Sequence, residues 1–155
     1  MLTDNKKLIP SEVPDHWTFW DYEGAIENWY QNDLSEEAQD QFDALLKNCA
    51  KIENHQQWPG FGKFLKGVKE PIWELEFRAD KRAYRVLCVF ASIVAPGCWP
   101  RATESTRKRA ILLAGCYHKQ GVYTPANAIN TAETRARALR EDKAKVYERP
   151  INQTL

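Results

Sequence analysis

Cationic and titratable side chains in the second half of the chain could bind or cleave a phosphate diester. Arg85 alternates with Leu87 and Val89 in an otherwise apolar run, so its charge requires an ion partner, an open cleft or an anionic ligand. A planar guanidinium can hold two phosphate oxygens at once, which favours a phosphate-facing Arg85. The alternative is a salt bridge to Glu74 or Glu76 across a sheet.

The segment Tyr117-His118-Lys119-Gln120 places an imidazole beside an ammonium at the predicted end of a strand. Such a pair supplies one group that titrates near neutral pH and one fixed positive charge. RNA cleavage requires removal of the 2′-hydroxyl proton, stabilisation of a more negative phosphorane and protonation of the leaving 5′-oxygen. Lys, Arg, His and Tyr side chains can do all three without a metal. Taken singly, each of them is more typical of a solvated surface.

Charge is divided unevenly along the chain. Residues 1–62 carry four basic and twelve acidic side chains, net −8, whereas residues 63–155 carry 18 basic and nine acidic ones, net +9. This division indicates an anionic partner for the second half, with attraction between the two halves of one domain as the alternative. Further cations lie around the predicted strands, at Lys63, Lys66, Lys69, Arg78 and Arg82.

The cysteines and histidines do not predict a metal site. The four cysteines form no CxxC pair, and the three histidines are widely separated. We therefore expect neither a metal nor another cofactor. No apolar run reaches the roughly 18–20 residues that a membrane helix needs, and the first seven residues lack the apolar segment of a secretory signal. A cytoplasmic protein without membrane contact is expected.

Hydrophobic periodicity predicts the elements that would position these residues. Aromatic residues favour a strand at 16–21, and two helices follow, the second capped by Ser35. Three consecutive strands are then expected, from alternation at 73–78, an apolar run at 83–91 and another at 109–116.

A last helix is predicted to start at Thr124-Pro125. This order predicts an α+β fold, with a helical hairpin packed on a small, mainly antiparallel sheet and a C-terminal helix. Residues 1–15 are expected to be a flexible lead-in, 16–147 the domain and 148–155 a tail.

Several short motifs follow one another between Trp17 and Tyr147. They are Phe64-Leu65-Lys66-Gly67, Ile72-Trp73-Glu74-Leu75, Arg82-Ala83-Tyr84-Arg85-Val86-Leu87, Ile111-Leu112-Leu113-Ala114-Gly115, His118-Lys119 and Thr124-Pro125, before a helix that carries Ala132 and Arg135. In this order they resemble the RelE/HigB superfamily of toxin ribonucleases, especially its phage-associated HigB-like branch.

The resemblance implies a RelE-like fold and a metal-independent endoribonuclease, an mRNA interferase, that cleaves messenger RNA, commonly on the ribosome, and leaves a 2′,3′-cyclic phosphate. It also implies a cognate antitoxin, often of the helix-turn-helix type. The functional positions of the family correspond to Lys66, Arg85 and Lys119. We expect Arg85 to stabilise transition-state charge, Lys66 to position the phosphate, and His118 to act as acid or base with help from Lys119. Further RNA contacts are expected from Lys63, Arg78, Arg82 and Tyr117.

The sequence departs from the family pattern at several positions. Glu76 stands where many relatives carry arginine, and Ala114-Gly115-Cys116 replaces the more usual His-Gly-Phe. Two other functions therefore stay open. One is a non-catalytic toxin that inhibits a protein target, as related ParE toxins do with gyrase. The other is an inactivated, phage-derived relative that binds only RNA or an antitoxin.

Overall fold

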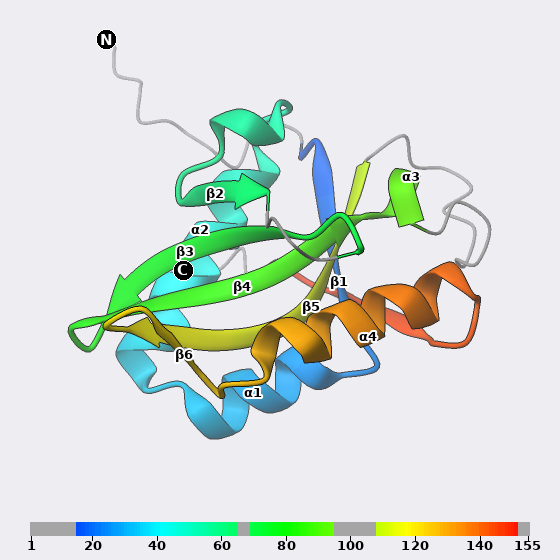
Figure 1. Cartoon of the computed structure of the whole chain (residues 1–155). Coiled ribbons are helices and arrows are strands. Elements are labelled where there is room, and N and C mark those ends of the chain that lie inside the picture. The colour runs from blue at the N-terminus through cyan, green and yellow to red at the C-terminus, as the bar shows by residue number, and fades with distance from the viewer. Residues whose placement is uncertain (1–14, 65–68, 95–107, 152–155) are drawn as a thin grey trace, which may run out of the picture.

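The computed structural model describes residues 15–64, 69–94 and 108–151 (Figure 1). Its helices are α1 (Ala25–Asp33), α2 (Glu36–Ala50), the short α3 (Ala91–Val94) and α4 (Ala128–Arg140), with a 3-10 turn at His55–Gln57. Its strands are β1 (Trp17–Tyr22), β2 (Phe61–Phe64), β3 (Trp73–Ala79), β4 (Arg82–Phe90), β5 (Lys108–Lys119), β6 (Val122–Thr124) and β7 (Val146–Arg149).

The strands form one sheet in the order β2-β3-β4-β5-β1-β7, and β6 pairs with the end of β5. β1 runs parallel to β5, whereas the other strand pairs of the described chain are antiparallel. The predicted α+β class is confirmed, but seven strands make the sheet larger than the small one predicted. The strands that the sequence missed, β2, β6 and β7, have only three or four residues, too few for a clear two-residue alternation.

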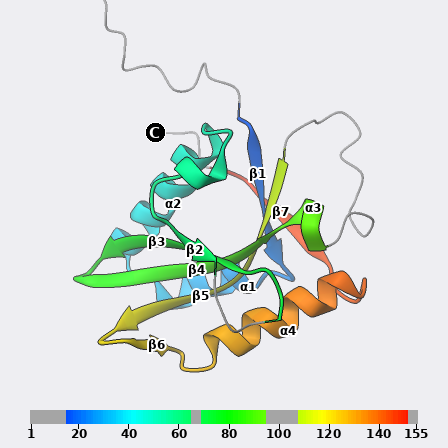
Figure 2. The same ribbon diagram turned by 45° about the horizontal axis from the view of Figure 1, so that its top comes forward.

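Helices cover both faces of the sheet (Figures 1 and 2). On one face, α1 and α2 pack through Ile26 and Phe42 against a core that includes Leu75 of β3. On the other face, α4 packs through Leu139 against a second core that includes Ile111 of β5. The helix α2 begins where predicted, because the Ser35 hydroxyl accepts a hydrogen bond from the Ala38 amide at 3.1 Å.

The end of β5 differs from the prediction in a way that matters for the site. Residues 117–119 belong to β5 itself and do not follow it. A two-residue turn at Gln120 (φ 53°) and Gly121 (φ 80°) then reverses the chain, and β6 pairs back along β5. Thr124 therefore does not cap the last helix. It ends β6 opposite Tyr117, and α4 starts at Ala128.

Two boundaries of the domain were predicted, after residue 15 and after residue 147. Residues 1–14 of the predicted lead-in lie outside the described residues. The strand β7 pairs with β1 and runs across the predicted boundary between residues 147 and 148. Within the described ranges, no helix is both long enough and apolar enough to cross a membrane.

Candidate functional site

A row of four side chains crosses the α4 side of the sheet near the turns that end β3 and β5. Arg78 lies opposite Ala83, Ala83 opposite His118, and His118 opposite Tyr123. Cross-strand partners share a face, so these four side chains lie on the same face of the sheet. The small side chain of Ala83 leaves room between the arginine and the imidazole.

A cavity of about 420 Å³ is lined by residues of the β3–β4 and β5–β6 turns, which lie at the same end of the sheet (Figure 1). We call it the hairpin-end pocket, and its lining residues are Arg78, Asp80, Lys81, Arg82, Ala83, His118, Lys119 and Gln120. Four of these side chains are cationic and one is a carboxylate. The pocket thus brings together four residues predicted for the site, Arg78, Arg82, His118 and Lys119.

The β3–β4 turn sets the shape of this pocket. Its central residues Asp80 (φ 53°) and Lys81 (φ 61°) are both left-handed, as a two-residue hairpin turn requires. The Asp80 carboxylate accepts hydrogen bonds from the hydroxyls of Ser35 at 2.6 Å and Tyr84 at 3.1 Å. The hydrogen bond from Ser35 is the main cause that lowers the pKa of Asp80. The one carboxylate of the lining is therefore already held by two hydroxyl donors.

On the α4 side of the sheet, His118 packs against Tyr123, a residue that was not predicted from the sequence. The two rings meet edge to face with their centroids 5.1 Å apart. The Tyr123 hydroxyl donates a hydrogen bond to Glu74, and burial together with this bond raises the pKa of Tyr123 to about 12. The Gln120-Gly121 pair was the available signal, because a two-residue turn there places Tyr123 beside His118.

Arg85 lies one row further along the same face, and its guanidinium contacts two glutamates. Nη1 is 2.7 Å from Oε1 of Glu74, and Nη2 is 3.5 Å from Oε1 of Glu76. Burial alone would lower the pKa of Arg85, but the charges of Glu74 and Glu76 outweigh burial and raise it. The cross-sheet salt bridge, which was the alternative to a phosphate-facing arginine, is thus present. A role for Arg85 at the transition state stays a prediction.

The remaining predicted residues are separated from this face or lie outside the described part of the chain. Tyr117 neighbours His118 along β5 and so points to the opposite face, where the Arg82 guanidinium lies 4.2 Å from its ring centroid. Lys63 belongs to β2, but its side chain lies outside the described residues, and so does the whole of Lys66. Their predicted contacts with RNA stay predictions.

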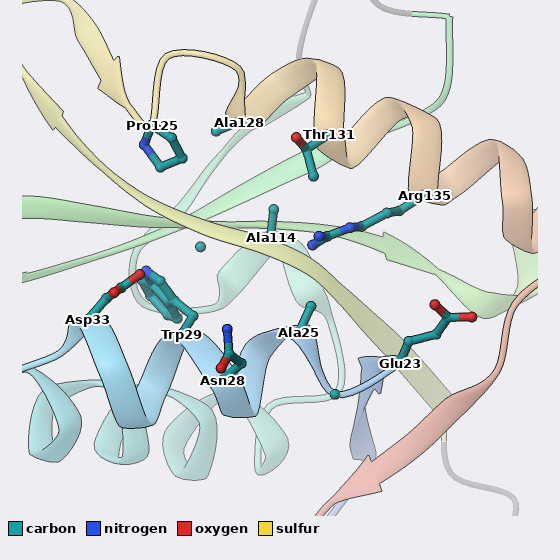
Figure 3. A pocket seen from close by; sticks show the side chains of 12 residues that line it. Glu23, Ala25, Asn28, Trp29, Asp33, Ala114, Pro125, Ala128, Thr131 and Arg135 are labelled. Atoms are coloured by element: carbon teal, nitrogen blue, oxygen red, sulfur yellow. The ribbon is translucent and has the colours of Figure 1, made fainter.

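A second cavity, of about 430 Å³, lies between α1 and α4 at the edge of β5 (Figure 3). In Figure 3, Arg135 reaches from α4 and Trp29 from α1 toward the strand between them. The Arg135 guanidinium donates to the carbonyl oxygen of Leu113 at 2.6 Å, and Glu23 and Asp33 add two carboxylates to the lining. This mixture of charges suits a phosphate less well than the hairpin-end pocket, and no residue predicted for the site lines it.

No three His, Cys, Asp or Glu side chains of the described residues are grouped so that they could hold a metal ion. Comparison with models of known protein families, with curated proteins and with solved structures found no match to this chain. The hairpin-end pocket and the motifs around it are therefore the features that bear on function.

Proposed function

We propose that this chain is a RelE/HigB-type toxin with a RelE-like fold that cleaves messenger RNA, and that the hairpin-end pocket holds RNA phosphates. The observation that carries the proposal is that Arg78, Arg82, Lys119 and His118 all line one cavity at the end of the sheet. Phosphate contacts by Lys and Arg supply much of the affinity of proteins for nucleic acids. A pocket with four cations and one hydrogen-bonded carboxylate supports such a ligand over an uncharged or cationic one.

The residues of the pocket can divide the reaction between them. His118 takes the proton from the 2′-hydroxyl, and the 2′-oxygen forms a bond to phosphorus as the bond to the 5′-oxygen breaks. Arg78, which lies on the same face of the sheet as His118, stabilises the additional negative charge of the phosphorane, and Arg82 holds a neighbouring part of the RNA from the rim of the pocket. Lys119 donates a proton to the leaving 5′-oxygen, and the products are a 2′,3′-cyclic phosphate and a 5′-hydroxyl. In this scheme the chain acts in the cytoplasm on messenger RNA, with or without the ribosome, and a small antitoxin blocks it.

One observation favours a second candidate, a relative that binds RNA without cleaving it. The charge of Arg85, the predicted transition-state residue, is countered by Glu74 at 2.7 Å and by Glu76 at 3.5 Å. An arginine held in this way contributes less to a developing negative charge than one that faces the substrate alone. Binding and cleavage must therefore be measured separately.

The test is a cleavage assay with purified protein on messenger RNA, both naked and on translating ribosomes. Because EDTA also removes the Mg²⁺ that ribosomes need, it is added only to the naked RNA. We expect cleavage with cyclic phosphate ends, and His118→Gln should lower the rate by about a hundredfold or more while RNA binding persists.

Arg137→Gln is the matched control for the loss of a cation, since Arg137 is an exposed residue of α4 outside the pocket. It should leave both binding and cleavage unchanged, whereas Arg82→Gln should weaken RNA binding. Cleavage that survives in His118→Gln would contradict the proposed mechanism. Wild-type protein that binds RNA but leaves every message intact would favour the second candidate.

A further inference from the structure

The carboxylate of Glu76 lies between two arginines on the α4 side of the sheet. Its Oε2 is 4.0 Å from Nη1 of Arg78, and its Oε1 is 3.5 Å from Nη2 of Arg85. Glu76 and Arg85 are direct cross-strand partners in β3 and β4, and Arg78 follows Glu76 by two residues on the same face. One anion therefore faces guanidinium groups from two adjacent strands.

The two glutamates that contact Arg85 differ in how firmly they are held. Glu74 is buried, its side chain is 7% exposed, and it accepts hydrogen bonds from Arg85 and Tyr123. The Glu76 side chain is 36% exposed, and both of its arginine contacts are longer than a hydrogen bond. The buried Glu74 thus fixes the orientation of the Arg85 guanidinium. The more exposed contact between Glu76 and Arg85 is the one that an incoming anion can replace.

We infer that Arg78 and Arg85 form a second phosphate subsite, which the Glu76 carboxylate fills when RNA is not bound. Two arginines that face one carboxylate present the donor pattern that also binds phosphate oxygens. This inference rests on the proposed function, because it concerns the same RNA strand that occupies the hairpin-end pocket.

The position of the subsite suits the neighbouring phosphate of that strand. Arg85 lies two residues along β4 from Ala83, which lines the hairpin-end pocket, a separation of about 7 Å. Arg78 lines the pocket and also contacts Glu76, so it links the two positions. Each RNA molecule that binds must displace the Glu76 carboxylate, and Glu76 therefore weakens binding.

The experiment compares the phosphate affinities of Glu76→Gln and Glu141→Gln, each measured by isothermal titration calorimetry with inorganic phosphate. Glu141 is the matched control, because it is also an exposed glutamate in an ion pair, 3.3 Å from Lys143, away from the site. Glu76→Gln should bind phosphate about tenfold more tightly than the wild type, and Glu141→Gln should stay within about twofold of it. Equal affinities of the two variants would overturn the subsite.

A second variant tests whether the gain in phosphate affinity depends on Arg78. In Glu76→Gln/Arg78→Gln the gain in phosphate affinity should disappear, because one of the two guanidinium groups is gone. A gain that persists in this double variant would overturn the inference. A short 2′-O-methyl RNA, which cannot be cleaved, should likewise bind more tightly to Glu76→Gln than to the wild type.

The cleavage assay distinguishes failure of this inference from failure of the proposed function. Tighter phosphate binding by Glu76→Gln without RNA cleavage by any variant would support the subsite and contradict the ribonuclease proposal. RNA cleavage by the wild type together with unchanged phosphate affinity in Glu76→Gln would overturn the subsite and leave the ribonuclease proposal standing.

Discussion

Gly115 has no side chain because the indole of Trp29 occupies the place where a Cβ would be. The carbons of the Trp29 ring system are the nearest atoms to that position. Gly115→Ala should therefore destabilise the fold by about 2 kcal/mol, since a packed core resists added volume. Urea unfolding measures the loss. In a Trp29→Ala background the same change should cost much less, and equal costs in both backgrounds would contradict this account.

The ion pair of Arg85 and Glu74 predicts a stability effect that activity measurements must take into account. Arg85→Ala leaves the buried Glu74 carboxylate with the Tyr123 hydroxyl as its remaining donor, and we expect a loss of about 3 kcal/mol. The double variant Arg85→Ala/Glu74→Ala should lose less than the sum of the single variants, because no carboxylate is then left unpaired. Urea unfolding of the three variants checks both expectations. An Arg85→Ala protein as stable as Arg137→Ala would contradict them.

At the scale of single elements, the β3–β4 turn predicts opposite effects on stability and on binding. Lys81 has a left-handed backbone (φ 61°), which costs an L-residue about 1–2 kcal/mol, whereas glycine adopts it freely. Lys81→Gly should therefore stabilise the fold by about 0.5–1 kcal/mol after the entropy of glycine is allowed for. It should also weaken RNA binding, because a cation leaves the pocket.

Asp142→Gly is the control for this turn, since Asp142 is also left-handed (φ 58°) and lies outside the hairpin-end pocket. It should not weaken RNA binding. Thermal unfolding and a binding titration on the same preparations separate the two effects. RNA affinity that is unchanged in Lys81→Gly would argue against a role of the β3–β4 turn in phosphate binding.

The longer elements could be predicted from the sequence because each has a pattern of its own. The helix after Ser35 and the alternation from Trp73 to Arg78 follow from local side-chain chemistry. β1 was predicted as a strand, but its parallel pairing with β5 was not, since that pairing joins residues about 90 positions apart. Tertiary contacts, not local pattern, fix such a neighbour.

The candidate site could be predicted in part for the same reason. The cations around the turns were visible in the sequence, and four of the predicted residues line one pocket. Tyr123 was missed because β6 has only three residues. The faces of β5 were also not foreseen, since β5 was expected to end at Cys116, and its extension puts Tyr117 and His118 on opposite sides.

At the scale of the whole molecule, a histidine among aromatic rings couples stability to pH. The ring centroid of His55 lies 4.4 Å from that of Phe90 and 5.3 Å from that of Phe61. Burial, with a smaller effect of Lys108, lowers the pKa of His55 below its usual 6.5. The unfolded chain therefore binds a proton at His55 more readily than the folded one. The contribution of His55 to the free energy of unfolding is thus fully present above pH 6.5 and is lost as the pH decreases from 6.5 to the folded pKa.

His55→Leu should remove this part of the pH dependence, and His16→Gln should retain it. Urea unfolding at about pH 7.5 and about pH 5.5, on either side of the ordinary histidine pKa, gives the comparison. A wild-type protein that loses no more stability between these values than His55→Leu would contradict the assignment to His55.

The division of charge between the two halves of the chain leads to the last prediction. Arg149 pairs with Glu27 across the halves, but the ion pairs of Arg85, Arg140 and Lys143 lie within the basic half. Of the cations of the hairpin-end pocket, Arg78 contacts Glu76 at 4.0 Å, whereas Lys81, Arg82 and Lys119 form no ion pair with another described residue and are available for an external anion. With three or four phosphate contacts, the affinity for single-stranded RNA should fall with salt at a log–log slope between about −2 and −3.

Fluorescence anisotropy of a labelled RNA at several salt concentrations measures this slope. Because each phosphate contact contributes about −0.7, Arg82→Gln should flatten the slope by about that amount, and Arg137→Gln should leave it unchanged. A wild-type slope near zero would mean that phosphates contribute little to binding. In that case a protein target, rather than RNA, would account better for the positive charge at the hairpin ends.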